Sequence, residues 1–183
     1  MSDLARSFER YTYEDYENWP EDFRCELIDG VVYMMSAPSV RHQQLVSELL
    51  WQLMNYFRGS GCQPFTSPFD VRLFPRNDKS DDVIVQPDLI VVCDEEKLSD
   101  GKSCRGAPDL VIEILSDSTR SLDLTIKYDR YKRSGVREYW IVGEDTVKVC
   151  QFQPDGTVTE KNHGFFGSRE ISSTVFPGLV LKF

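Results

Sequence analysis

Two acidic residues stand at apolar strand-like runs of the sequence. Glu113 lies in the middle of the run 110–115 (LVIEIL), and Asp88 directly precedes the run 89–93 (LIVVC). An ionised carboxylate in an apolar setting is costly unless something compensates its charge. Glu113 can therefore point out of the sheet into water, form a structural ion pair with a basic side chain, or bind a cation.

The two acids are expected to meet if their strands are antiparallel neighbours. If Cys93 lies opposite Pro108 or Asp109, the numbers of paired residues sum to 201 or 202, and those of Asp88 and Glu113 sum to 201. Directly opposite side chains share a face with Cβ atoms about 5 Å apart. Two carboxylates this close repel each other, and a divalent cation between them removes the repulsion. A slip of one residue would place them on opposite faces.

A basic residue for this site is expected from the helix predicted over 119–134. Lys127 and Arg120 lie at the edge of the apolar stripe of this helix, placed to lean across the sheet towards the acids. The alternative for Lys127 is that it extends into solvent. The apolar stripe itself consists of Leu124, Tyr128 and Tyr131.

The same helix suggests two surfaces. The C-terminal end of this helix is locally basic. It is either a solvated charged surface or a patch that faces phosphate groups. Leu122 and Ile126 lie opposite the apolar stripe, and two exposed apolar residues there would favour a homodimer contact. The basic residues are Arg130, Lys132, Arg133 and Arg137.

Four further residues are weighed as candidates. Glu26 lies on a predicted hairpin. It is either a further metal or water ligand at the same edge as the acids, or a surface residue. His42, near the start of a helix, is an accessory base or, in the favoured interpretation, a hydrogen-bonded structural residue. Asp109 at a strand start is interpreted as a turn residue, and His163 carries no signal.

The elements that must position these residues follow from patterning. A hairpin over 25–34 turns at Asp29-Gly30, because glycine tolerates the positive φ of a tight turn. Strands are expected over 70–74, 89–93, 110–115, 138–142 and 179–183, and a second hairpin turns at 154–156. The clearest helix spans 39–57, with Leu45, Leu49, Leu53 and Tyr56 on one stripe. These elements predict an α+β, α/β-like fold: one mixed β-sheet flanked by helices, with N-terminal and C-terminal hairpins, in a single domain over 1–183.

Composition bounds the class of protein. The chain has 183 residues and a formal net charge of −9, which argues against a sequence-blind DNA coat protein but not against a nuclease. No apolar run reaches the length of a membrane helix, and we expect a cytoplasmic protein. Its five cysteines are scattered, so most are expected to be buried or reduced thiols, and a structural zinc site is not expected.

Five stretches in this order resemble the Uma family of bacterial restriction endonuclease domains, in the PD-(D/E)XK nuclease superfamily. They run from about residue 20 to the C-terminus, so the resemblance covers nearly the whole chain. The stretches are CELIDGVVYMMSAPSVRHQQ, VQPDLIVV, GAPDLVIEILSDST, the helix with Lys127-Tyr128, and GVREYWIV.

The resemblance implies a restriction-endonuclease-like core: a helix, three antiparallel strands, a crossover helix and a further strand. It implies that Asp88 and Glu113 bind Mg²⁺ or Mn²⁺ and that the protein hydrolyses phosphodiester bonds, with DNA as the favoured substrate. The superfamily's lysine usually lies two residues after the second acid, where this chain has Leu115. Lys127 is the expected replacement.

Two other interpretations remain open. The first is a catalytically silent module that binds nucleic acid or protein and retains the fold. The second is a structural or regulatory homodimer.

Overall fold

The computed structural model describes residues 9–20, 22–165 and 169–183. Its helical segments are α1 (Tyr13–Tyr16), α2 (Val40–Tyr56), the 3-10 helix η1 (Glu95–Leu98), α3 (Arg120–Leu122), the π-helical η2 (Asp123–Lys127) and α4 (Tyr128–Ser134). Its strands are β1 (Cys25–Ile28), β2 (Val31–Met34), β3 (Gln63–Thr66), β4 (Val71–Arg72), β5 (Ile84–Val85), β6 (Leu89–Val92), β7 (Cys104–Arg105), β8 (Leu110–Ile114), β9 (Glu138–Val142), β10 (Thr146–Phe152), β11 (Val158–Gly164), β12 (Glu170–Ser172) and β13 (Val180–Lys182).

The largest sheet has the strand order β11-β10-β9-β8-β6-β3. Strands β3, β6 and β8 run antiparallel, and β9 lies parallel to β8 after a helical crossover. This is the expected order of helix, three antiparallel strands, crossover helix and further strand. The first of the three strands is nevertheless β3, because the segment predicted over 70–74 forms only the short β4 in another sheet.

The prediction of a single mixed sheet is wrong. A second mixed sheet has the order β2-β1-β5-β4-β7, and β12 pairs with β13 separately. The N-terminal hairpin has the expected register, with Ile28 opposite Val31 and the positive φ angles of the turn at Asp29 (54°) and Gly30 (74°). Leu27 pairs with Ile84, so the hairpin extends this second sheet through a contact that local sequence pattern does not encode.

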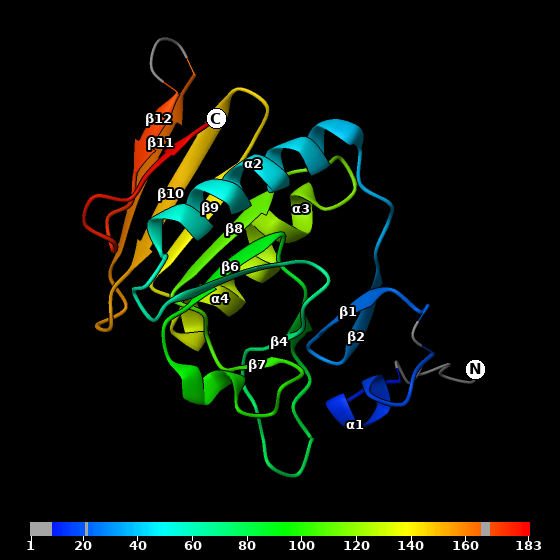
Figure 1. Cartoon of the computed structure of the whole chain (residues 1–183). Helices are drawn as coiled ribbons and strands as arrows, with labels where there is room; N and C mark the ends of the chain where they lie inside the picture. The colour runs from blue at the N-terminus through cyan, green and yellow to red at the C-terminus, as the bar shows by residue number, and fades with distance from the viewer. Residues whose placement is uncertain (1–8, 21, 166–168) are drawn as a thin grey trace.

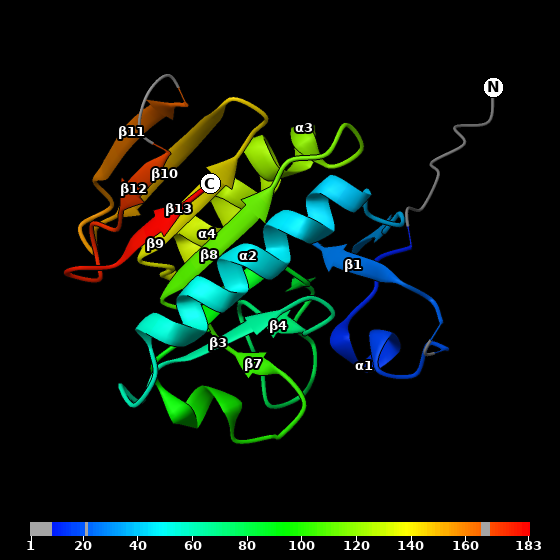
Figure 2. The same ribbon diagram turned by 45° about the horizontal axis from the view of Figure 1, so that its top comes forward.

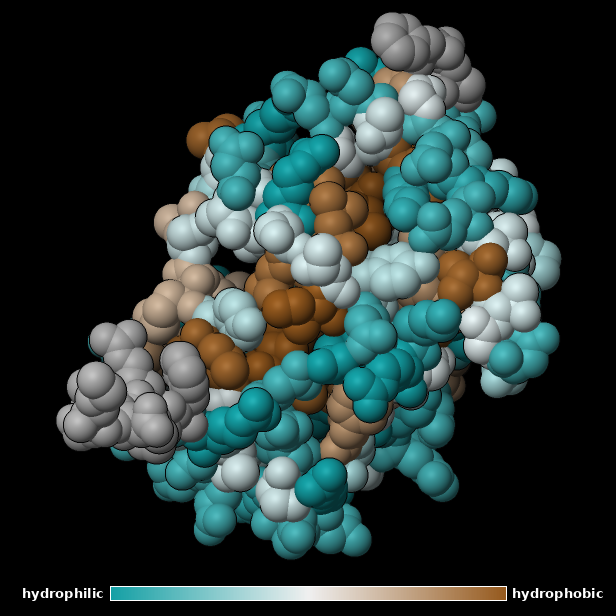
Figure 3. Space-filling view, turned by 180° about the vertical axis from the view of Figure 1, so that it is seen from behind, coloured by the Kyte–Doolittle hydropathy of each residue, from teal (hydrophilic) through white to brown (hydrophobic). Residues whose placement is uncertain are grey.

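Helices cover both faces of the large sheet. Helix α2 crosses the face nearer the viewer in Figure 1, and α4 lies behind the sheet, while the hairpin β1–β2 lies to one side (Figures 1 and 2). Alternate residues of β8 face the two layers: Ile112 packs in the cluster that contains α2, and Val111 in the cluster that contains Tyr131 of α4. Seen from behind, apolar residues show through as a band between hydrophilic margins (Figure 3).

Helix α2 buries a slightly different stripe from the expected one. Leu49 and Leu53 are fully buried as predicted, but Tyr56 is 38% exposed and the neighbouring Phe57 takes the inward position. Tyr56 instead donates a hydrogen bond to the carbonyl oxygen of Pro177 at 2.9 Å. In the part of the chain described, no helix is both long and apolar enough to cross a membrane.

The crossover helix contains a π-helical segment, η2, which changes the face that points inward. Asp123 and Lys127 are buried there, whereas Leu124, expected in the buried stripe, is 40% exposed. Leu122 and Ile126, expected to be exposed, pack half-buried against the core. A π-helical turn holds more residues than an α-helical turn, so a stripe projected at α-helical spacing shifts. The argument for a homodimer from Leu122 and Ile126 therefore fails.

Two of the five cysteines form a disulfide, Cys62–Cys93, across 31 residues of sequence. Gln63 pairs with Val92 in neighbouring strands, which places the two cysteines opposite each other at the strand ends. The other three cysteines are free and buried, as expected for most of them.

Removing this disulfide is expected to lower the free energy of unfolding by about 3–4 kcal/mol, the loop-closure entropy for a loop of this length. Urea denaturation of the parent and of the Cys62→Ser, Cys93→Ser double variant measures the difference. Reductant should destabilise the parent, which has the disulfide, but not the double variant, which therefore also serves as the control. Alkylation of all five cysteines in the denatured, unreduced parent would contradict the pairing.

Candidate active site

Asp88 and Glu113 meet at one edge of the sheet, where β6 begins and β8 ends. Leu89 pairs with Ile112, so the paired numbers sum to 201 as predicted and Asp88 lies opposite Glu113. The Asp88 amide donates a hydrogen bond to Glu113 Oε2 at 3.2 Å, and the Ile114 amide donates to Asp88 Oδ2 at 2.7 Å. The register prediction is therefore confirmed, and the two acids form the centre of the site.

Lys127 reaches these acids from the crossover helix. Its Nζ lies 2.8 Å from Glu113 Oε1 and 2.8 Å from Glu26 Oε1, and the side chain is 4% exposed. The solvent interpretation of Lys127 is therefore wrong, and so is the interpretation of Glu26 as a surface residue. Glu26 also accepts a hydrogen bond from the Gln86 amide at 2.8 Å, so the hairpin reaches the same edge as the acids.

Two residues at the site were not predicted as site residues: Asp123, and Tyr131, which was expected only in the apolar stripe of the helix. Tyr131 donates a hydrogen bond from its hydroxyl to Glu113 Oε1 at 2.7 Å. Asp123 Oδ1 lies 3.5 Å from Lys127 Nζ and makes no hydrogen bond. The spacing of Asp123 and Lys127, four residues apart in a helix, was a signal that could have found this pair.

His42 contacts the site from the opposite side. Its Nε2 lies 3.1 Å from Asp88 Oδ2, and its amide donates to the side chain of Ser39, the N-cap of α2. The hydrogen bond with Asp88 raises the pKa of His42, although partial burial opposes the rise. His42 thus bonds an acid of the site, as a structural residue or an accessory base would.

The buried cluster holds more negative than positive groups. Burial raises the pKa of Glu113 to about 8 against the opposing charge of Lys127, and neighbouring carboxylates add to the rise. Burial likewise raises the pKa of Asp123. Burial disfavours the charged form of Lys127, but the surrounding carboxylates outweigh it and hold the pKa of Lys127 well above its usual value. The cluster therefore tends to take up a proton or a cation.

This charge excess predicts that the metal-free protein loses stability as the pH rises from about 5 to about 8. In that range the unfolded Glu113 carboxyl is ionised while the folded cluster binds a proton, so the folded state binds more protons and the free energy of unfolding falls with pH. The Lys127 contribution is constant there, since the lysine is charged in both states.

Urea denaturation in EDTA across this range measures the slope. Glu113→Gln should flatten it, whereas the matched exposed substitution Glu48→Gln should not. A slope that is unchanged in Glu113→Gln would show that Glu113 does not carry the proton.

The donor set suits a magnesium ion that keeps several waters. Asp88 Oδ1 has no hydrogen bond to any described residue, and Glu113 Oε2 has one acceptor position beyond its bond to the Asp88 amide. Within the described ranges, no group of three acidic, histidine or cysteine side chains is arranged to hold a metal. Mg²⁺ is commonly bound by one or two carboxylates, with water and phosphate oxygens completing the shell. Asp88 and Glu113 fit that pattern.

The acids line a cleft of about 1010 Å³ between the N-terminal hairpin, the start of α2 and the crossover helix. Its walls also carry many hydroxyl groups, which can donate hydrogen bonds to phosphate oxygens. These include Ser36, Ser39, Ser67, Ser116, Ser118, Thr119, Ser121 and Thr125.

Several other sequence candidates lie outside the cluster. Asp109 accepts a hydrogen bond from the Cys93 amide and pairs with Arg137. Arg120 is exposed and has no ion pair among the described residues. Carboxylates also pair with Arg130 and Arg133, so most of the basic end of the helix is neutralised and the phosphate-facing interpretation loses its support.

Comparison with known proteins shows similarity in family profile, in sequence and in fold. Residues 13–183 match the profile of Uma2, a family described as putative restriction endonuclease. An uncharacterized protein of Synechocystis sp., slr1290, is 27% identical over 147 residues, which is 78% of this chain and 73% of the relative. A crystal structure of a putative nuclease belonging to DUF820 from Anabaena variabilis superposes with a TM-score of 0.65 at 20% identity. The superposition covers 84% of this chain and 85% of that one and shows a shared fold.

Proposed function

The chain belongs to the Uma2 putative restriction endonuclease family, and on that premise we propose that it is a metal-dependent nuclease that hydrolyses phosphodiester bonds, with DNA as its substrate. The observation that carries the proposal is the meeting of Asp88, Glu113 and Lys127 at one edge of the cleft. Asp88 and Glu113 lie opposite each other, and Lys127 Nζ lies 2.8 Å from Glu113. An acid pair and a lysine are the residues that the resemblance to the PD-(D/E)XK superfamily led us to expect.

Asp88 and Glu113 would hold Mg²⁺ or Mn²⁺, which supplies a Lewis acid for the phosphoryl oxygen and lowers the pKa of bound water. The chain's own groups do the rest. Lys127 compensates the charge of the acids and, in this proposal, would orient the attacking water or stabilise charge on the phosphoryl group. Tyr131 fixes Glu113 through its hydrogen bond, and His42 does the same for Asp88.

A second candidate is a catalytically silent binding module that retains the fold. The observation that favours it is the saturation of Lys127, whose ammonium group contacts Glu26, Glu113 and Asp123 and is almost fully buried. In this second candidate, Lys127 acts as a structural counter-ion and takes no part in chemistry. The two candidates differ in whether the cluster opens to bind a metal and a phosphate.

Calorimetric titration with Mn²⁺ and a nicking assay on supercoiled plasmid test the proposal together. A nuclease should bind Mn²⁺ at one site and convert plasmid to nicked or linear forms only when the metal is present. Absence of metal binding would reject the nuclease in favour of the silent module. Nicking that persists in excess EDTA would also reject the proposed chemistry.

A further inference from the structure

A second pocket adjoins the cleft on the other side of His42. It has a volume of about 400 Å³ and lies between the first half of α2, the turn that follows β9, and the C-terminal strands. The two hollows share four wall residues, which are Ser39, His42, Ile114 and Leu115. His42 also bonds Asp88, so the pocket begins one side chain away from the proposed metal ligands.

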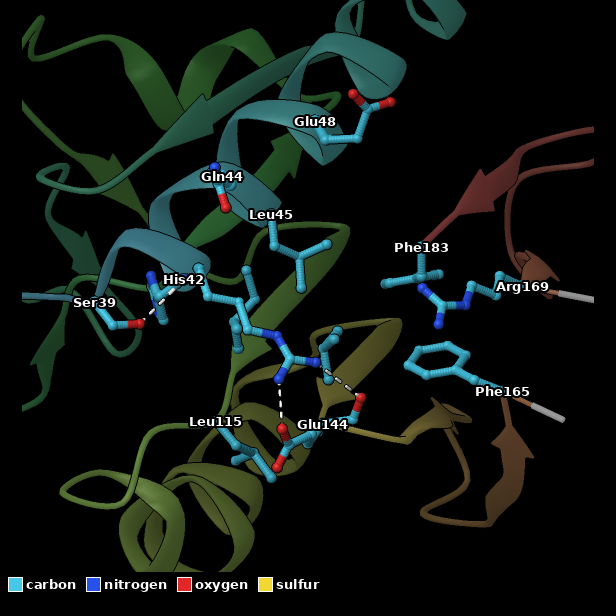
Figure 4. A pocket seen from close by; sticks show the side chains of 14 residues that line it. Ser39, His42, Gln44, Leu45, Glu48, Leu115, Glu144, Phe165, Arg169 and Phe183 are labelled. Carbon is cyan, nitrogen blue, oxygen red and sulfur yellow. Dashed lines mark hydrogen bonds and ion pairs between the residues drawn. The ribbon is translucent and has the colours of Figure 1, made fainter.

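The far wall of this pocket is aromatic. Figure 4 shows Phe165, Arg169 and Phe183 on one side of the pocket, facing Leu45 of α2, with His42 farther along the helix beside Ser39. The rings of Phe165 and Phe183 lie 5.6 Å apart at an interplanar angle of 30°. The buried Trp140 stacks against Phe183 at 6.1 Å and helps to fix its orientation. Half-buried aromatic faces of this kind are surfaces on which an unpaired nucleobase stacks.

One cation of the pocket, Arg169, can bind a phosphate group, on the wall opposite the Glu48 carboxylate. Arg41 is paired with Glu144, so its charge is compensated. Arg169 lies over the Phe165 ring at 5.5 Å and has no carboxylate partner in the described chain. Its guanidinium is planar and can bind a phosphate or stack on a base. Gln44 and Glu48 add polar groups along the α2 side that can bond the edge of a base.

We propose that this pocket binds the nucleotide next to the scissile phosphate with its base unpaired, which makes the substrate a single strand or a frayed duplex end. The inference rests on the proposed nuclease function, because the cleft is what places the cleaved phosphate beside the pocket. A base within an intact duplex is stacked and paired, and it would have to be extruded to enter. The aromatic wall therefore selects for strands whose bases are already free.

The test measures binding without cleavage. The Asp88→Asn protein in EDTA is titrated into a ten-nucleotide single strand that carries 2-aminopurine, and into the same sequence as a duplex. Stacking should quench the fluorescence of the single strand, and the duplex should bind at least about tenfold more weakly. Phe165→Leu, which keeps an apolar side chain but removes the ring, should weaken single-strand binding about tenfold and restore the fluorescence.

Arg169→Gln should weaken binding. It should also reduce the slope of log affinity against log salt concentration by the amount of about one phosphate contact. The matched controls are Arg58→Gln, just after the C-terminal end of α2, and Trp51→Leu, on the exposed surface of α2. Both should bind like the Asp88→Asn protein. Equal affinity for single strand and duplex, or binding unchanged in both Phe165→Leu and Arg169→Gln, would overturn the inference.

The two proposals fail in different ways. If the protein neither binds Mn²⁺ nor cleaves supercoiled plasmid or circular single-stranded DNA, but Phe165→Leu still abolishes the quenching, the base-binding pocket is supported and the nuclease is rejected. If the parent nicks plasmid but neither Phe165→Leu nor Arg169→Gln weakens single-strand binding, the pocket is rejected and the nuclease stands.

Discussion

Replacing Lys127 with methionine is expected to lower the free energy of unfolding by about 3–5 kcal/mol, because it leaves buried carboxylates without their cation. The methionine fills a similar volume, so the loss reports charge rather than a cavity. Three acids contact the ammonium group: Glu26, Glu113 and Asp123. Their charges repel one another once Lys127 is gone, and the protein must either bind protons or open the cluster.

Urea denaturation at pH 5 and at pH 8 measures this effect. The destabilisation should be larger at pH 8, where the acids of the variant are harder to keep protonated. Lys182→Met is the matched control, since Lys182 pairs with Glu170 at the surface, and it should unfold close to the parent at both values. If the Lys127→Met protein were as stable as the parent at pH 8, its buried carboxylates would have to be neutralised by bound protons even at that pH, and the expected charge effect would be absent.

Removing either proposed metal ligand is expected to abolish both metal binding and cleavage. Asp88→Asn and Glu113→Gln should each reduce the nicking rate by about a thousandfold, because a metal contributes several kcal/mol to such a reaction and each 1.36 kcal/mol is tenfold in rate. Calorimetry with Mn²⁺ should show no binding in either variant. The two measurements must fail together, since the same oxygens are proposed to serve both.

The chain offers a close control for the Asp88 substitution. Asp109 also follows a proline at a strand start, but its carboxylate is bonded to the Cys93 amide and Arg137 instead of the cluster. Asp109→Asn should therefore bind Mn²⁺ and nick plasmid at nearly the parental rate. If Asp88→Asn retained nicking while Asp109→Asn lost it, the metal site would have been assigned to the wrong Pro-Asp pair.

The sequence alone predicted which two acids could meet at the centre of the site. A strand has a repeat of two residues and an antiparallel pair has a constant sum of residue numbers, so one assumed neighbour limited that sum to 201 or 202. The structure has the sum of 201, which places Asp88 opposite Glu113. The hairpin at Asp29-Gly30 was equally local, because glycine tolerates the positive φ of such a turn. Family membership rested on the order of five stretches and is confirmed over residues 13–183.

Tertiary structure decided what surrounds those acids. The π-helical segment turned Asp123 and Lys127 inward and Leu124 outward, and a sequence projected at α-helical spacing cannot show where a helix widens. The hairpin brought Glu26 to Lys127 by joining β5, a contact between distant segments. Local pattern sets which residues share a face, but long-range packing sets which faces meet. The contacts of Lys127 with the acids of the site depend on that packing.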